Sequence, residues 1–213
     1  MSLYEDSAIK ISEFLLQIKA IKLQPSNPFT WASGWKSPIY CDNRKTLSYP
    51  QIRTYIRQQL VNAIIEEFGK PDVIAGVATA GIAQGVLVAQ EMGLPFVYVR
   101  SEAKSHGMTN QIEGVIEPGQ SVVVIEDLIS TGMSSLKAVE ALRANGCEVK
   151  GLAAIFSYGF NIAEENFLAH KCKYVVLSNY DFLIEQAKEL SHISKDDLVS
   201  LKEWRENPQN WKK

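Results

Sequence analysis

From Asp72 onward, short apolar runs alternate with segments of helical periodicity. We read four runs as strands: DVIAGVA, PFVYVR, SVVVIED and EVKGLAAIF. Helices are expected between them, one at GIAQGVLVAQEMG and one from Ser134 to Asn145 that Gly146 closes. This alternation predicts βαβ units with right-handed connections. The middle of the chain should therefore be an α/β fold built on a parallel sheet.

The segments on either side have a different character. Apolar spacing predicts a helix from about Tyr4 to Ala20, and another that follows Pro50 and stops before Gly69. Pro, Ser, Gly and Asn are dense between these helices, which predicts hairpins or loops. After Ser157 we expect a strand at KYVVLS and helices around DFLIEQAKEL and DDLVSLKEWREN, with Trp204 on the apolar face of the last one.

Composition narrows the class of protein. With 213 residues and 46% hydrophobic content, the chain can bury one sizeable core. A net charge of -2 disfavours nucleic acid or a membrane as the main partner, and the sequence has no run of about 18 apolar residues that could span one. The three cysteines are far apart and form no CxxC pair. We expect neither disulfides nor a zinc site, and a cytoplasmic location.

Two acids and a hydroxyl-rich loop follow the run VVVI. The loop around Thr131 and Gly132 supplies hydroxyls and backbone N–H groups at the start of a helix, which suits a phosphate dianion. Glu126 and Asp127 would repel a phosphate, so we expect them to face sugar hydroxyls at the end of their strand. The loop ATAGIA should emerge at the same edge of the sheet. The expected ligand is a sugar phosphate.

Three stretches carry a family resemblance. IEDLISTGMS resembles the phosphoribosyl-pyrophosphate (PRPP) signature of type I phosphoribosyltransferases. YVRSEAKSHGMTNQIEG resembles the mobile catalytic loop of the orotate phosphoribosyltransferases, with Arg100, Lys104, His106 and Gly107 at matching spacing. FTWASGWKSPIYCDNRKTLSYP is similar to their orotate-side segment, with Lys22 upstream. The resemblance covers nearly the whole chain.

The resemblance implies a type I phosphoribosyltransferase fold, with a central parallel sheet flanked by helices. A single domain (1–213) would carry a small hood, formed mainly by about residues 1–45 and the C-terminal part. The implied reaction joins orotate to the 5-phosphoribosyl group of PRPP, giving orotidine 5′-monophosphate and pyrophosphate in pyrimidine synthesis. Mg²⁺ would be held mainly by PRPP and pyrophosphate oxygens, with no dedicated protein metal site. A homodimer is implied, with each catalytic loop serving the neighbouring subunit.

The resemblance also implies residue roles. Three cations would serve the pyrophosphate, and the acid pair would favour positive charge on the ribose ring. The expected catalytic residues are Lys104, His106, Arg100 and Asp127. The expected orotate-binding residues are Ser130, Lys22 and Tyr40. The expected PRPP-binding residues are Arg100, Lys104, His106, Glu126, Asp127, Leu128, Ile129, Ser130, Thr131, Gly132, Met133 and Ser134.

Several positions depart from the family pattern. Ser101 replaces a second basic residue of some members, and no lysine lies near Ala80, so pyrophosphate contacts would be fewer. FSYGF lacks the arginine that some relatives direct at the orotate carboxylate; Lys22, Ser130 and backbone amides are the candidates here. Tyr40-Cys41 stands where other members have paired aromatics, which leaves Tyr40 to stack on the base.

Two other functions remain open at this point. A purine-specific type I phosphoribosyltransferase would keep the PRPP loop but should differ around Lys22 and Tyr40. A non-catalytic PRPP-sensing regulator would keep the acid pair, lose the catalytic loop and add a nucleic-acid-binding module. The presence of the loop sequence and of the orotate-side segment favours the orotate enzyme.

Overall fold

A central sheet organises the computed structural model, which describes residues 3–31, 34–101 and 111–212. Within these residues the sheet has six strands in the order β10-β9-β8-β5-β6-β7, and β7 alone among them runs antiparallel to its neighbour. The predicted α/β architecture is confirmed. The strands are β5 (Val73–Val77), β6 (Phe96–Val99), β7 (Ile112–Glu113), β8 (Ser121–Ile129), β9 (Glu148–Ser157) and β10 (Tyr174–Asn179).

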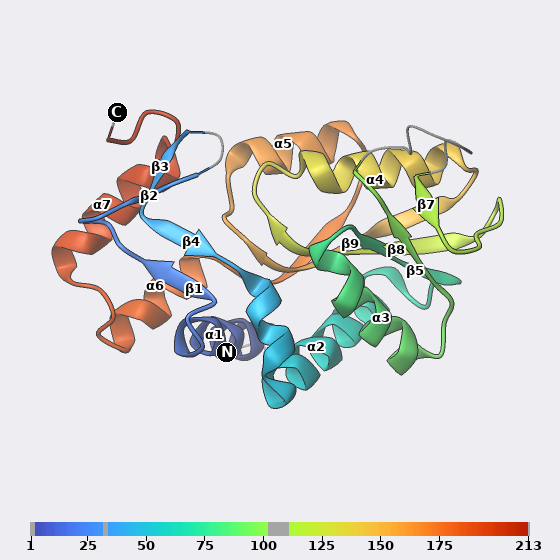
Figure 1. Ribbon diagram of the computed structural model, residues 1–213, viewed down its shortest axis with the longest axis horizontal. Helices are drawn as coiled ribbons and strands as arrows, with labels where there is room; N and C mark the ends of the chain where they lie inside the picture. Colours follow the sequence, from blue (N-terminus) through green and yellow to red (C-terminus); the bar gives the residue numbers. More distant parts are fainter. Residues whose placement is uncertain (1–2, 32–33, 102–110, 213) are drawn as a thin grey trace.

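Helices cover both faces of the sheet (Figure 1), with α4 and α5 on one face and α2 and α3 on the other. Strand β8 shows why both faces need cover. Val122 and Val124 belong to one apolar cluster, whereas Val123 and Ile125 belong to the other. A strand buried on both faces is a continuous apolar run. The four helices are α2 (Pro50–Phe68), α3 (Ala80–Met92), α4 (Met133–Ala144) and α5 (Asn161–Ala169).

Elements from the two ends of the chain lie side by side at one end of the molecule, blue beside red in Figure 1. Helix α1 packs on α6 and β10, and the Trp204 ring of α7 contacts the Trp31 ring at 5.7 Å between centroids. We call these elements the hood. They are α1 (Leu3–Gln17), β1 (Ile21–Leu23), β2 (Phe29–Thr30), β3 (Lys36–Ser37), β4 (Ile39–Cys41), the 3-10 helix η1 (Asn43–Ser48), α6 (Tyr180–Glu189) and α7 (Lys195–Glu206).

The structure corrects two local predictions and adds two elements that were not predicted. Strand β8 does not end at the acid pair but continues to Ile129, which pairs with Ser157 of β9. The first helix ends at Gln17 rather than near Ala20, because Lys19 takes a left-handed φ of 54° while its apolar neighbours stay buried. Helix α5 and the two-residue strand β7 were not predicted. No helix among the described residues is long and apolar enough to cross a membrane.

Candidate active site

The acid pair lies inside β8, near the carboxyl end of the sheet. Glu126 is 6% exposed, and its carboxylate accepts hydrogen bonds from Ser135 Oγ and from the backbone N–H of Asp127, both at 3.0 Å. Alternation along the strand turns the Asp127 side chain to the opposite face. Glu126 therefore contacts the start of α4, whereas the half-buried Asp127 side chain lies on the other face of β8.

Burial changes the charge of this pair. Burial, and after it the charge of Asp127, raise the pKa of Glu126 to about 8. Burial also raises the pKa of Asp127. Both carboxyl groups therefore resist ionisation in the folded protein, and near neutral pH the ligand-free pair carries fewer than two negative charges. This charge state reduces the repulsion that two adjacent carboxylates would exert on a phosphate.

The loop between β8 and α4 has the geometry of an anion cradle. Gly132 has a φ of 78°, and a Cβ there would lie 2.6 Å from Cε2 of Phe167. Asn166 Nδ2 donates to the Thr131 carbonyl at 2.9 Å. These contacts hold the loop so that the first N–H groups of α4, beginning at Met133, are available to an anion. Sequence reasoning missed Asn166 and Phe167 because it did not predict α5.

The first turn of α3 lies directly against β8 at Ile125 and Glu126. A Cβ on Gly81 would lie 2.4 Å from the Ile125 carbonyl oxygen and 3.5 Å from Cα of Glu126. Only glycine permits this approach of one backbone to the other. The expectation that ATAGIA and the acid-pair loop emerge at the same edge is therefore confirmed.

A cavity of about 310 Å³ opens between the hood and the end of β8. We call it the hood cavity. It contains two of the three expected orotate residues, Tyr40 and Ser130, whereas Lys22 lines a separate cavity of about 400 Å³, although it pairs with Tyr40 across β1 and β4. The residues that line the hood cavity are Thr30, Trp31, Tyr40, Cys41, Leu128, Ser130 and Tyr158.

The hood cavity is lined by aromatic rings and by an uncharged thiol. Tyr40 is 40% exposed, and its ring centroid lies 5.6 Å from that of Phe29. Burial, and after it the charge of Asp127, raise the pKa of the Cys41 thiol well above its ordinary value. Cys41 therefore stays a neutral thiol, as expected for a packing residue. The cavity suits a planar ring that stacks on Tyr40.

Asn43 connects this cavity to the acid pair and was missed from the sequence. The residue is 1% exposed, and its Nδ2 donates to the Asp127 carbonyl at 2.7 Å. Its Oδ1 accepts from the Cys41 thiol at 3.3 Å. One amide thus ties a wall of the hood cavity to the strand that carries Asp127. In the sequence, Asn43 looks like any other turn residue of its polar segment.

The base of the expected catalytic loop is closed by strand pairing. Arg100 N–H donates to the Gln111 carbonyl at 2.9 Å, directly beyond the antiparallel pair β6 and β7. Arg100 Nη1 also lies 3.4 Å from Glu113 Oε1. Arg100 and Gln111, on either side of the expected loop, are therefore held together at one place on the sheet. Lys104, His106 and Gly107 lie outside the described residues.

The described part of the chain does not group metal-binding side chains into a site for an ion. Among residues 3–31, 34–101 and 111–212, no group of three or more His, Cys, Asp or Glu side chains could hold an ion. The acid pair offers at most two carboxylates, one of them turned toward Ser135. This set fits an ion held chiefly by a ligand's own oxygens.

Comparison with known proteins agrees with this geometry. The phosphoribosyl transferase domain model matches residues 50–187. The chain is 58% identical to orotate phosphoribosyltransferase of Porphyromonas gingivalis, over 94% of this chain and 96% of that protein. It is 55% identical to orotate phosphoribosyltransferase of Listeria monocytogenes, over 96% of this chain and 98% of that protein.

Solved structures show the same fold. Orotate phosphoribosyltransferase from Aeropyrum pernix superposes with a TM-score of 0.75 at 27% identity, over 86% of this chain and 99% of that one. UMP synthase of Leishmania donovani gives a TM-score of 0.80 at 25% identity, over 95% of this chain and 43% of that one. The chain therefore belongs to the phosphoribosyl transferase domain family and, within it, to the orotate phosphoribosyltransferases.

Proposed function

We infer that this chain transfers the 5-phosphoribosyl group of PRPP to orotate, releasing pyrophosphate and forming orotidine 5′-monophosphate in pyrimidine synthesis. One observation carries the inference beyond the family match. Ser130 lines the hood cavity, and the next residue, Thr131, opens the anion cradle. A base in the cavity and a phosphate in the cradle would then be held at the two ends of one ribose.

The acid pair would act on the sugar between them. The Asp127 side chain lies on the opposite face of β8 from Glu126 and would accept hydrogen bonds from ribose hydroxyls. As the bond from C1′ to pyrophosphate breaks and the base nitrogen attacks C1′, positive charge develops on the ring. A fixed carboxylate nearby lowers the energy of that charge. Glu126, held by Ser135, would keep Asp127 in place rather than contact the sugar itself.

The two phosphate-bearing ends would be held by different groups. Backbone N–H groups and hydroxyls of residues 130–134 would hold the 5′-phosphate at the start of α4. Arg100 would bind the pyrophosphate from the base of its loop, together with Lys104 and with His106, which can donate a proton to the leaving group.

Lys104→Ala should cut turnover strongly in a folded protein. Unchanged turnover would remove that lysine from the mechanism.

Mg²⁺ fits this donor set as a partner of the substrate. Among the residues that the structure describes, Asp127 would supply a carboxylate ligand to the ion, and PRPP oxygens and water would supply the other ligands. When bound, the ion would neutralise negative charge on the leaving pyrophosphate. The protein's own part is to hold ribose, phosphate and base in one geometry, which lowers the entropic cost of reaction.

We further propose a cytoplasmic homodimer in which one chain (1–213) forms a single hooded domain and each catalytic loop acts in its neighbour's site. Mixing Lys104→Ala protein with Asp127→Asn protein, under conditions that allow chain exchange, tests this arrangement. If the loop acts in the partner's site, one site of each mixed dimer regains both residues and activity returns. If it acts in its own chain, activity stays absent.

The reaction itself is tested by the ultraviolet absorbance of orotate during incubation with protein, PRPP and Mg²⁺. Adenine, hypoxanthine and uracil serve as parallel bases. We expect PRPP- and Mg²⁺-dependent loss of orotate, with orotidine 5′-monophosphate as product. Turnover of a purine alone would overturn the base assignment. PRPP binding without turnover of any base would instead indicate a sensor.

A further inference from the structure

We propose that Trp204 and Arg205, consecutive residues of α7, are positioning residues that set the shape of the hood cavity for the base, an inference that rests on the proposed function. Neither residue lines this cavity. Trp204 contacts two residues that line the cavity, and Arg205 contacts the residue that directly follows one of them. The C-terminal helix would thus determine base affinity without touching the base.

Trp204 supports two walls of the cavity at once. Its side chain is fully buried, and its ring centroid lies 5.7 Å from that of Trp31 and 5.8 Å from that of Tyr158. Both partners line the hood cavity. Phe160 and Tyr180 close the cluster at 5.3 and 5.6 Å from Trp204. Since packed rings at these distances have few alternative placements, Trp204 fixes where Trp31 and Tyr158 stand.

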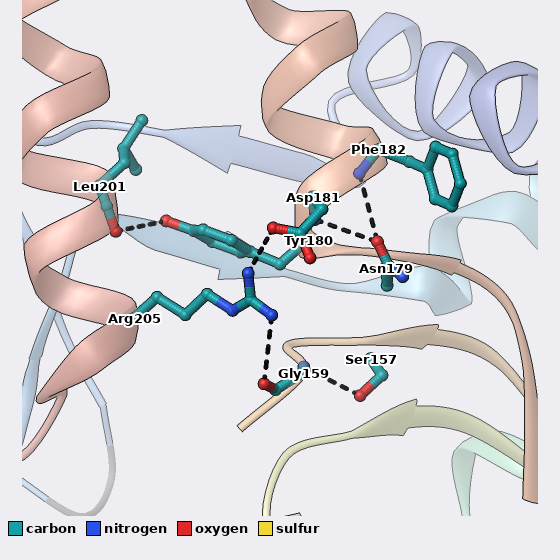
Figure 2. A network of polar contacts seen from close by, with 8 residues as sticks. All are labelled: Ser157, Gly159, Asn179, Tyr180, Asp181, Phe182, Leu201 and Arg205. Carbon is teal, nitrogen blue, oxygen red and sulfur yellow. Dashed lines mark hydrogen bonds and ion pairs between the residues drawn. The ribbon is translucent and has the colours of Figure 1, made fainter. Parts of the chain in front are cut away.

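Arg205 holds the residue that follows Tyr158. Figure 2 shows its guanidinium between Asp181, with which it forms an ion pair, and the Gly159 carbonyl, which lies 3.5 Å from Nη2. Gly159 has a φ of 66°, and a Cβ there would lie 3.0 Å from Nη2. Its N–H donates to Ser157 Oγ at 3.0 Å. The peptide after Tyr158 is therefore held on both sides.

The far end of this chain of contacts is anchored to the sheet. Asn179, the last residue of β10, caps α6 by accepting from the N–H groups of Asp181 and Phe182 at 3.0 and 3.2 Å (Figure 2). Tyr180 donates to the Leu201 carbonyl of α7 at 2.9 Å. Asp181 is thus a fixed partner for Arg205. Through Arg205 and Asp181, the position of Gly159 depends on the end of β10 in the central sheet.

Arg205 lies on the other side of the hood-cavity wall, and neighbouring residues of the chain line the two sides of that wall. Ser130 and Tyr158 line the hood cavity, whereas Thr131 and Gly159 line a second cavity of about 570 Å³ together with Arg205. Arg205 therefore acts from behind the wall. Its ion pair is largely solvent-exposed, with 66% of the Asp181 side chain accessible. Such pairs contribute little to stability, so loss of Arg205 should appear in base binding rather than in unfolding.

The test compares Arg205→Met with Arg205→Lys and with Lys202→Met, which removes an exposed cation from the same helix and the same second cavity. We expect Arg205→Met to raise the KM for orotate by about fivefold, as loss of one partly exposed charged hydrogen bond would. The KM for PRPP should stay within about twofold, and Tm should fall by no more than about 4 °C. Arg205→Lys should recover part of the loss, and Lys202→Met should behave as wild type.

Trp204→Phe supplies a second, independent variant. It keeps an aromatic ring in the cluster but is smaller, so Trp31 and Tyr158 gain freedom, and the KM for orotate should again rise while that for PRPP does not. Two results would overturn the inference: an unchanged KM for orotate in both variants, or an equal rise in both KM values together with a large loss of Tm. Wild-type protein that fails to consume orotate would overturn the proposed function instead, before any variant is made.

Discussion

The two sides of the candidate active site are built in opposite ways. The phosphate side, residues 126–134, is one continuous segment that carries acids, hydroxyls and the cradle. The hood side brings Trp31 and Tyr40 of the N-terminal segment together with distant Tyr158, and Trp204 contacts two of these three rings. The expected 5′-phosphate site is thus contained in one local segment, whereas the shape of the hood cavity exists only after folding.

The two sides also differ in what their burial does to stability. On the phosphate side, Glu126 is buried beside Asp127, and its raised pKa shows that the folded state disfavours the second charge. On the hood side, packed rings contribute favourable burial. Changes on the phosphate side should therefore alter PRPP chemistry, whereas changes on the hood side should alter stability or base affinity.

Trp204→Ala should give the largest effect and tests the hood side. Removing a fully buried indole leaves a cavity among four rings, and the free energy of unfolding should fall by about 3–5 kcal/mol. Urea unfolding measures the loss. Val199→Ala, on an exposed site of the same helix, is the matched control and should change stability by less than about 0.5 kcal/mol. A loss below about 1 kcal/mol in Trp204→Ala would show that the ring cluster is not what stabilises the hood.

Asp127→Asn tests the phosphate side. Replacing the carboxylate should lower kcat/KM for PRPP by about 100-fold, because a neutral amide stabilises ribosyl charge poorly. Stability should be unchanged or slightly higher, since burial already raises the pKa of Asp127. Steady-state kinetics and thermal unfolding report the two quantities, with exposed Asp196→Asn as control. Unchanged kinetics would remove Asp127 from the ribose site.

Glu126 predicts a pH dependence of stability. Its folded pKa of about 8 exceeds its ordinary value of 4.5, so its neutral form favours the folded state. That contribution is complete below about pH 4.5 and is lost as pH rises toward about 8, by at most about 1.4 kcal/mol per pH unit. Urea unfolding from about pH 5 to about pH 8 should show this slope in wild type and a flatter one in Glu126→Gln. Parallel profiles would contradict the assignment.

Asn43→Ala gives the smallest expected effect and asks whether the two sides are coupled. Loss of the bond to the Asp127 carbonyl should lower the free energy of unfolding by about 1 kcal/mol. Because Asn43 also meets Cys41, the KM values for PRPP and for orotate should both rise. Kinetics and unfolding are compared with exposed Asn27→Ala. A rise in one KM alone would mean that the two sides respond independently.

Local patterns were sufficient for most strands of the sheet. The apolar runs predicted β5, β6, β8 and β9, and the acids with the Thr131-Gly132 loop pointed to a sugar phosphate. Helix α5 escaped prediction because it has nine residues and begins after Phe160, whose side chain cannot cap a helix by accepting a hydrogen bond. Strand β7 is only two residues long and exists through its pairing with β6.

The different surroundings of the two acids could not be predicted either. Glu126 and Asp127 are adjacent and chemically alike, and the sequence offered both to the sugar. The continuation of β8 to Ile129 places them on opposite faces, and Ser135 then engages Glu126 alone. Register against β9 is a long-range property, so strand pairing rather than residue type placed their side chains on opposite faces.

By itself the sequence determined the α/β class, the order of the main elements and the segment that would hold a phosphate, because hydrophobic period and loop chemistry are local properties. Tertiary structure alone decided the hood cavity, the link from Asn43 to Asp127 across 84 positions and the hold of Arg205 on Gly159 across 46. Those contacts depend on which segments folding brings within hydrogen-bond or ring-contact distance, and no local pattern along the chain encodes that distance.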